Sequence, residues 1–212
     1  PSYAHSDKCY PVIYMHDGQN LFDDLSSYAG EWRVDETMQS LEPEGLEAIV
    51  VGIPNTGSER LNEYSPFPHP RMGGGNGHAY LDFVAETVKP LIDSTFDTQP
   101  DRAHTGLLGS SMGGLISLYG FFQRPDVFGF AGVMSPALWF GRRAIYDYVM
   151  YAPFRPGRIY LDIGTDEVRG RSSMYTNYVT EMYGLLVEKG YRDQIDIHYV
   201  EEHDGQHNEA AW

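Results

Sequence analysis

One serine in this chain has neighbours whose types and spacing suggest nucleophilic chemistry. Residues 109–113 read Gly-Ser-Ser-Met-Gly, a G-x-S-x-G pattern centred on Ser111. An apolar run precedes the pattern and apolar residues at helical spacing follow it, which predicts a sharp turn between a strand and a helix. A glycine two residues away on each side relieves backbone crowding at such a turn, because glycine has no Cβ. We therefore expect Ser111 to be a nucleophile; the alternative is a glycine-rich turn that only leads into a core helix.

A serine hydroxyl is a weak nucleophile unless a base takes its proton. His207 follows the last predicted strand, at the end of a parallel sheet where sites form, and is the preferred base. His203 is the alternative, and either histidine could instead be a solvated loop residue. The orienting acid should lie between Ser111 and the histidine in chain order. Asp166 and Glu167 both directly follow a predicted strand and both can serve; we prefer Glu167.

Backbone N–H groups could stabilise the negative charge that develops on an attacked carbonyl. The N–H of Met112 starts the helix after the nucleophile and points towards the reacting atoms. The second donor should come from the turn at residues 17–20, where Gly18 allows the chain to turn and bring the N–H of Gln19 towards Ser111.

Strand-like and helix-like segments alternate along the chain and must position these groups. Strands are expected at 11–16, 48–54, immediately before the serine turn, and at 128–134, 158–164 and 194–200. Helices are expected at 31–41, at 79–96 with a kink or a new segment at Pro90, after the serine turn, at 143–151, and from 175 to a stop at Gly190. Residues 55–77 show no periodicity and predict a long loop. The alternation predicts an α/β fold: one domain over residues 1–212, with a mostly parallel sheet and helices on both faces.

Composition excludes several classes of partner. The chain has 15 basic and 30 acidic residues and a formal net charge of -15, which argues against binding nucleic acid or an anionic membrane. Cys9 is the single cysteine, so no intrachain disulfide can form. The sequence contains no run of 18 apolar residues, so no membrane-spanning helix is expected. His203 and His207 do not form an H-E-x-x-H pair, and neither a metal nor an organic cofactor is expected. A cytoplasmic location is expected, or a secreted or periplasmic one if a signal peptide precedes Pro1.

Four segments together resemble the esterase family of α/β-hydrolases. They are residues 16–22 (HDGQNLF), 109–114 (GSSMGG), 164–167 (GTDE) and 207–212 (HNEAAW). That family includes enterochelin esterases, feruloyl and acetyl xylan esterases, S-formylglutathione hydrolases and mycolyltransferases. The resemblance extends over nearly the whole chain and implies an α/β-hydrolase fold.

The resemblance also implies roles for individual residues. Ser111 would be the nucleophile and His207 the base, with the N–H groups of Gln19 and Met112 as the oxyanion hole. The family acid usually stands fourth in a G-T-x-[DE] segment, which is Glu167 here, although the third place is acidic too. Family members carry further strands before the first one seen here and a helix after the last residue, so both ends are expected to be truncated.

The substrate is less defined by the sequence than the reaction. Aromatic walls suit sugar or aromatic acyl groups, although core packing is the alternative for each such residue. The candidates for the pocket wall are Trp32, Arg60, Tyr64, Trp139 and Trp212. We expect hydrolysis of a carboxylic ester, on a small-molecule substrate of the carbohydrate or siderophore type, through an acyl-enzyme on Ser111. Acyl transfer to an alcohol, or a catalytically silent domain that binds a carbohydrate or a partner, are the alternatives.

Overall fold

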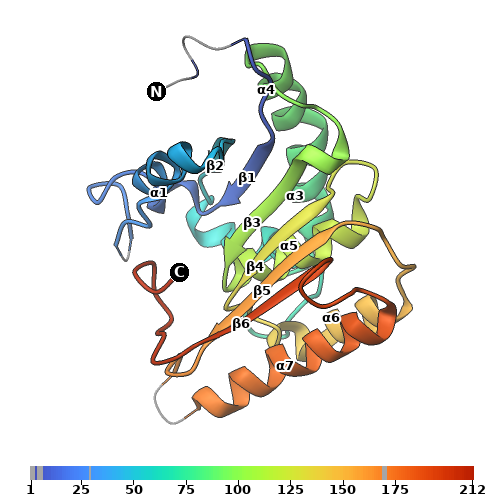
Figure 1. Cartoon of the computed structure of the whole chain (residues 1–212). Helices are drawn as coiled ribbons and strands as arrows, with labels where there is room; N and C mark the ends of the chain where they lie inside the picture. Colours follow the sequence, from blue (N-terminus) through green and yellow to red (C-terminus); the bar gives the residue numbers. More distant parts are fainter. Residues whose placement is uncertain (1–2, 4–6, 29, 169–170) are drawn as a thin grey trace.

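The computed structural model describes residues 3, 7–28, 30–168 and 171–212. Six strands form one sheet in the order β2-β1-β3-β4-β5-β6, and every neighbouring pair is parallel (Figure 1). The strands are β1 (Val12–His16), β2 (Ile49–Ile53), β3 (Thr105–Ser110), β4 (Phe130–Met134), β5 (Arg158–Gly164) and β6 (Ile197–Glu202). The expected parallel α/β architecture is therefore confirmed.

Helices connect the strands, as a parallel sheet requires. The α-helices are α1 (Val34–Leu41), α2 (Arg60–Glu63), α3 (Gly77–Phe83), α4 (Lys89–Thr95), α5 (Met112–Gln123), α6 (Phe140–Tyr151) and α7 (Ser172–Lys189). Short turns of other helix types are η2 (Gly18–Asn20), η3 (Glu42–Glu44), η4 (Gly57–Glu59), η5 (Val84–Val88) and η6 (Arg102–His104). No helix in the described part of the chain combines the length and apolar character that a bilayer crossing requires.

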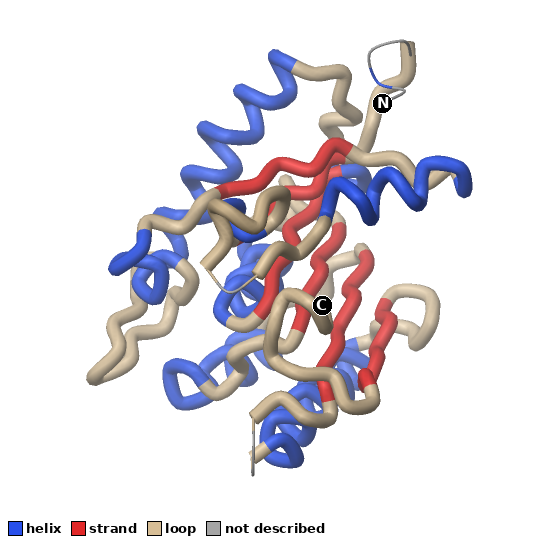
Figure 2. The backbone as a smooth tube through the Cα atoms, turned by 90° about the vertical axis from the view of Figure 1, so that its left-hand side faces the viewer, coloured by secondary structure: helices blue, strands red, loops and turns tan. Residues whose placement is uncertain are grey.

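The two faces of the sheet carry separate apolar cores, because successive side chains of a strand point to opposite sides. Tyr14 and Leu107 face the larger core, which α3, α5 and α7 cover. Met15 and Leu108, one residue further along each strand, face the smaller core with Trp32 and Val34. Figure 1 shows α1 on one side of the sheet and the remaining large helices on the other, and in Figure 2 the C-terminal segment lies in front of the strands. Among the described helices, most therefore cover the face with the larger core, and α1 covers the other face.

Strand order places an opening beside β1. The strand that follows β1 in the chain, β2, pairs with one of its edges, and β3 pairs with the other. The connections that leave the carboxyl ends of β1 and β3 therefore run in opposite directions, which creates a crevice where ligands bind in open α/β sheets. The Ser111 turn follows β3 and the turn at residues 17–20 follows β1, so both border this crevice.

One local expectation is confirmed and two need correction. The helix predicted at 79–96, with a new segment at Pro90, is observed as three consecutive segments, α3, the π-helical turn η5 and α4, with Pro90 near the start of α4. Proline lacks the N–H that a continuous helix needs, so a new segment begins there. The predicted loop at 55–77 contains η4 and α2, which are too short to produce a periodic pattern. Helix α1 begins at Val34 rather than at residue 31, because Arg33 before it has a left-handed backbone with φ 57°.

Candidate active site

Ser111 alone forms the turn between β3 and α5. Its φ of 55° and ψ of −117° lie in a region that non-glycine residues rarely occupy. Three backbone hydrogen bonds hold it there: its N–H donates to the Met134 carbonyl at 2.9 Å, and its carbonyl accepts from the N–H groups of Leu115 at 3.1 Å and Ala137 at 2.9 Å. The side chain of Ser111 remains partly exposed at the carboxyl edge of the sheet.

The two glycines of the motif are required by close packing. A Cβ on Gly109 would lie 2.9 Å from the backbone carbon of Gly113 and 2.9 Å from a ring carbon of His16. A Cβ on Gly113 would lie 3.2 Å from the Cβ of His16. The strand and the helix thus approach too closely for larger residues, which is the reason expected from the sequence.

Glu167 contacts His207 directly. The Nδ1 of His207 is hydrogen-bonded to Oε2 of Glu167, whose side chain is only 2% exposed. The other carboxylate oxygen accepts from the Ser135 hydroxyl at 2.5 Å and from the Gly164 N–H at 2.9 Å. Burial raises the pKa of the Glu167 carboxyl, but the hydrogen bonds from His207, Ser135 and Gly164 outweigh burial and hold that pKa below its ordinary value.

The alternative acid and base lie elsewhere. The side chain of Asp166 is exposed, while its N–H donates to the carbonyl of Gly205 at 2.9 Å. The side chain of His203 is 88% exposed, and its Nδ1 lies 3.0 Å from Oδ2 of Asp204. The structure therefore brings Glu167, rather than Asp166, to His207 and leaves His203 in solvent.

Ser111 and His207 line the same cleft, which has a volume of about 500 Å³. The hydrogen bond from Nδ1 to Glu167 leaves Nε2 as the ring nitrogen that can accept a proton. Among the described contacts, no hydrogen bond joins the Ser111 hydroxyl to His207. Such contacts are often long in enzymes without substrate and tighten in the complex.

The two expected oxyanion donors occupy helix starts beside this cleft. Met112 is the first residue of α5 and Gln19 lies in the single turn η2, so neither N–H has an obligatory partner within its helix. The reason for Gly18 differs from the expectation. The left-handed residue of the turn is Asp17, with φ 56°, whereas a Cβ on Gly18 would lie 2.5 Å from the backbone of β2. Gly18 is thus needed for close packing against Gly52 and Ile53.

The residues expected in the pocket wall are divided by the structure. Trp32 and Trp212 line the cleft with ring centroids 5.6 Å apart, and the ring of Trp212 meets that of His207 edge-to-face at 4.9 Å. Arg60 also lines the cleft. Tyr64 does not, because it is fully buried behind Arg60. Trp139 packs against the larger core and lies outside the lining of the cleft.

Three residues near the site were not expected from the sequence. Ser135 follows β4 with φ 38°, and its hydroxyl accepts from Nε1 of Trp212 at 2.9 Å while donating to Glu167. Asn20 and Glu209 are both buried and line the cleft, joined by a 3.0 Å hydrogen bond. Of the three, Ser135 could have been predicted from the sequence, because a polar residue directly after a buried strand of a parallel sheet often lies at the functional site.

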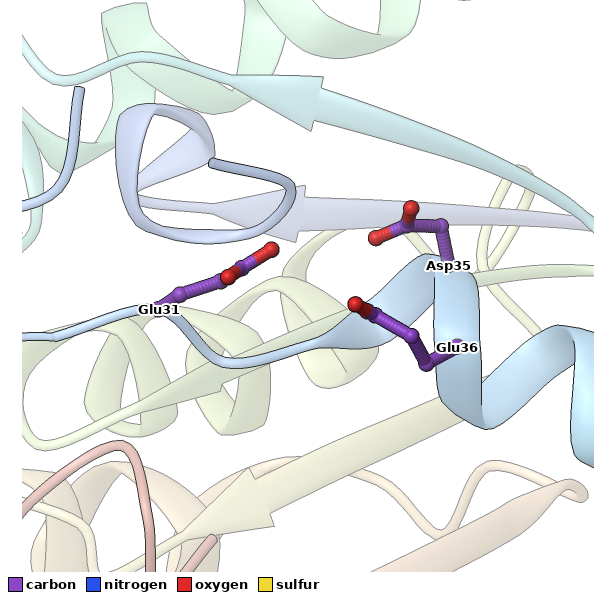
Figure 3. Close-up of side chains that lie close together, drawn as sticks. All are labelled: Glu31, Asp35 and Glu36. Carbon is purple, nitrogen blue, oxygen red and sulfur yellow. The ribbon is translucent and has the colours of Figure 1, made fainter. Parts of the chain in front are cut away.

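An acidic cluster lies at the start of α1 and on the segment before it. The carboxylates of Glu31, Asp35 and Glu36 come within 4.8 Å of one another, and Asp35 and Glu36 are exposed (Figure 3). Slight burial and the charges of Glu36, Asp24 and Asp35 raise the pKa of the Glu31 carboxyl. Among the described residues this is the one group with ligand atoms close enough for a metal ion, but exposed acidic groups of this kind are common without one, and we assign no metal to it.

Comparisons with known proteins identify the family and the fold of this chain. The family model described as "Putative esterase" matches residues 1–212. The uncharacterized protein YbbA of Bacillus subtilis is 27% identical over 208 residues, covering 92% of this chain and 78% of that protein. The siderophore triacetylfusarinine C esterase of Aspergillus fumigatus is 30% identical over 141 residues, which are 64% of this chain and 47% of that enzyme. The chain thus spans about half the length of the fungal enzyme.

A solved structure supports the fold independently. The siderophore hydrolase EstA of Aspergillus nidulans has a TM-score of 0.75 at 22% identity, with 97% of this chain and 80% of that chain covered. At that identity the likeness concerns the fold. Because the family model covers the whole chain, this protein belongs to the esterase family of α/β-hydrolases, as its motifs predicted.

Proposed function

We propose that this protein hydrolyses carboxylic esters through an acyl-enzyme formed on Ser111, with His207 as general base and Glu167 as the orienting acid. The single observation that carries the proposal is the hydrogen bond between buried Glu167 and His207, because His207 lines the cleft that the strained Ser111 also lines. That bond fixes one ring nitrogen and leaves the other for proton transfer.

The chemistry proceeds in two halves. His207 accepts the proton of the Ser111 hydroxyl while the serine oxygen attacks the ester carbonyl, and the N–H groups of Met112 and Gln19 stabilise the oxyanion. His207 then gives its proton to the departing alcohol as the carbon–oxygen bond breaks. Water repeats the sequence on the acyl-enzyme and releases the acid. The ionised Glu167 stabilises the imidazolium in both halves, and its lowered pKa keeps it ionised at neutral pH.

For the substrate we propose a small ester of the siderophore or carbohydrate type. The support is the pair of indole rings of Trp32 and Trp212 beside the cleft, together with relatives whose names describe them as siderophore esterases. As far as its residues are described, the cleft beside Ser111 does not have the several unpaired basic side chains that a highly anionic substrate would need. Arg60 is the one arginine or lysine in the described lining of the cleft, and it is paired with Asp17. A neutral ester is therefore preferred over a highly anionic one.

Labelling with a fluorophosphonate tests the nucleophile. The native chain should react covalently, whereas Ser111→Ala should neither react nor hydrolyse p-nitrophenyl acetate. Ser110→Ala serves as the matched control, since it removes the neighbouring hydroxyl and should still label. Equal turnover by the native chain and Ser111→Ala would refute the proposal. No labelling of the native chain would instead favour a silent binding domain.

A further inference from the structure

Two residues at helix α2 hold Asp17, and we propose that both of them, Arg60 and Tyr64, are positioning residues for the oxyanion donor on Gln19. This inference rests on the proposed function, because it explains how one of the two oxyanion donors is kept in place. It also changes the expected role of both residues from binding substrate to supporting the backbone that binds it.

Arg60 and Tyr64 bind opposite ends of the same residue. The Nε and Nη2 of Arg60 donate to the two carboxylate oxygens of Asp17, each at 2.7 Å. The N–H of Asp17 donates to the hydroxyl oxygen of Tyr64 at 2.9 Å. The two supporting residues are also joined to each other. The Tyr64 N–H donates to the Arg60 carbonyl at 2.9 Å, and the guanidinium lies 5.1 Å from the centroid of the tyrosine ring.

The backbone of Asp17 determines where η2 points. Asp17 has φ 56° and ψ 45°, a left-handed conformation that costs free energy in a residue other than glycine. Its carbonyl accepts from the Asn20 N–H at 2.9 Å, so η2 and the Gln19 N–H follow from its conformation. Asn55 adds a second connection, donating to the Asp17 carboxylate at 2.7 Å and to the Gln19 side chain at 3.1 Å.

The surroundings of Tyr64 make its hydroxyl hard to replace. The rings of His16, Tyr64 and Tyr80 lie with their centroids 5.2 to 5.5 Å apart, and all three residues are buried. The Nδ1 of His16 is hydrogen-bonded to the Tyr80 hydroxyl at 2.7 Å, while its buried Nε2 meets no partner among the described residues. Because these rings bury the Tyr64 hydroxyl, its removal leaves the Asp17 N–H without the acceptor that holds it.

The positive charge of Arg60 is neutralised by the carboxylate of Asp17. Burial raises the pKa of the Asp17 carboxyl, but the Arg60 guanidinium outweighs burial and holds that pKa below its usual value. The pair is therefore ionised at neutral pH, and two of the guanidinium nitrogens are engaged by Asp17 rather than by a ligand. Such a bidentate pair suits a geometric role, because it fixes orientation as well as distance.

The test compares Tyr64→Phe and Arg60→Lys with the native chain. Each variant should lower kcat for p-nitrophenyl acetate by about 10- to 100-fold and change KM by less than about 2-fold, because an oxyanion donor acts mainly in the transition state. The inhibition constant of an alkyl boronic acid, which forms a tetrahedral adduct with the serine, should rise by a similar factor. The inhibition constant of the product carboxylate should not change. If Tyr64 and Arg60 had a purely structural role, the variants would lose thermal stability, but kcat and boronic acid binding would not fall selectively while KM and product binding stayed the same.

Tyr14→Phe is the matched control. Tyr14 is a fully buried tyrosine on β1 whose hydroxyl has no hydrogen-bond partner within the described part of the chain, so its removal should leave kcat and KM unchanged. If Ser111→Ala is inactive but folded Tyr64→Phe and Arg60→Lys keep the native kcat, the inference is overturned and the proposed function stands. If Tyr64→Phe does not fold, Arg60→Lys decides by the same criterion. A chain without Ser111-dependent turnover would refute the proposed function together with this inference.

Discussion

The side-chain amide of Asn20 donates a 3.0 Å hydrogen bond to the carboxylate of Glu209 across 189 positions of sequence. Asn20 belongs to the turn that carries Gln19, and Glu209 follows His207 by two residues. Both side chains are buried. This bond therefore joins the loop with the expected oxyanion donor to the loop with the expected base.

Removal of Glu209 should affect both stability and turnover. Glu209→Ala leaves the buried Asn20 amide without its acceptor, which should lower the free energy of unfolding by about 1–3 kcal/mol. The loosened loops should also reduce kcat. Urea unfolding and steady-state kinetics measure the two effects. Asp204→Asn is the control in the same loop, because Asp204 is exposed and asparagine tolerates its φ of 58°. Equal behaviour of the two variants would contradict the assigned connection.

The choice between the adjacent acids can be tested directly. Glu167→Gln should lower kcat by roughly 10³- to 10⁴-fold, since the amide no longer stabilises the imidazolium or selects its tautomer. Asp166→Asn should change kcat by less than about 2-fold, because that side chain is exposed and does not contact His207. Hydrolysis of p-nitrophenyl acetate measures both. The opposite order of effects would assign the acid to Asp166.

Two buried groups should give opposing pH dependence of stability. Burial lowers the pKa of His16 to about 4, so between pH 4 and 6.5 the unfolded chain binds more protons at His16 and stability rises with pH. Burial raises the pKa of Asp162 to about 6, so between pH 4 and 6 the folded chain binds more protons there and stability falls with pH. The two contributions largely cancel across this interval.

Asp162→Asn removes one of these opposing contributions. The variant keeps a side-chain acceptor for the Ser135 N–H, which donates to Asp162 at 2.8 Å. Its free energy of unfolding relative to the native chain should increase by about 2 kcal/mol from pH 4 to pH 6. Urea unfolding at half-unit pH intervals measures this difference. A difference that stays constant with pH would show that folding does not raise the pKa of Asp162.

Glycine substitutions separate close packing from helix propensity. Gly109→Ala should lower the free energy of unfolding by about 1–3 kcal/mol or more, because the new Cβ would lie 2.9 Å from backbone and ring atoms. Gly184→Ala in α7 is the control, since its Cβ would meet nothing within 4 Å and alanine favours a helix by about 1 kcal/mol. Thermal unfolding of both variants should therefore show shifts of opposite sign.

The sequence by itself determined the features that depend on local spacing. Continuous apolar strands alternating with helices indicate a parallel sheet, and G-x-S-x-G between a strand and a helix places Ser111 on its turn, because crowding at such a turn acts over five residues. The family motifs also indicated the esterase family. These inferences need no knowledge of distant contacts.

Only the tertiary structure decided which neighbouring groups meet. Asp166 and Glu167 were both candidates by sequence, with Glu167 preferred, and the turn after β5 directs Asp166 into solvent and Glu167 against His207, 40 residues away. Arg60 and Tyr64 lie in a segment without periodicity, yet the short helix α2, which begins at Arg60 and ends just before Tyr64, brings both to Asp17, 43 and 47 residues earlier. Hydrogen bonds depend on the direction of each side chain in space, and that direction follows from how the loops pack rather than from the order of residues.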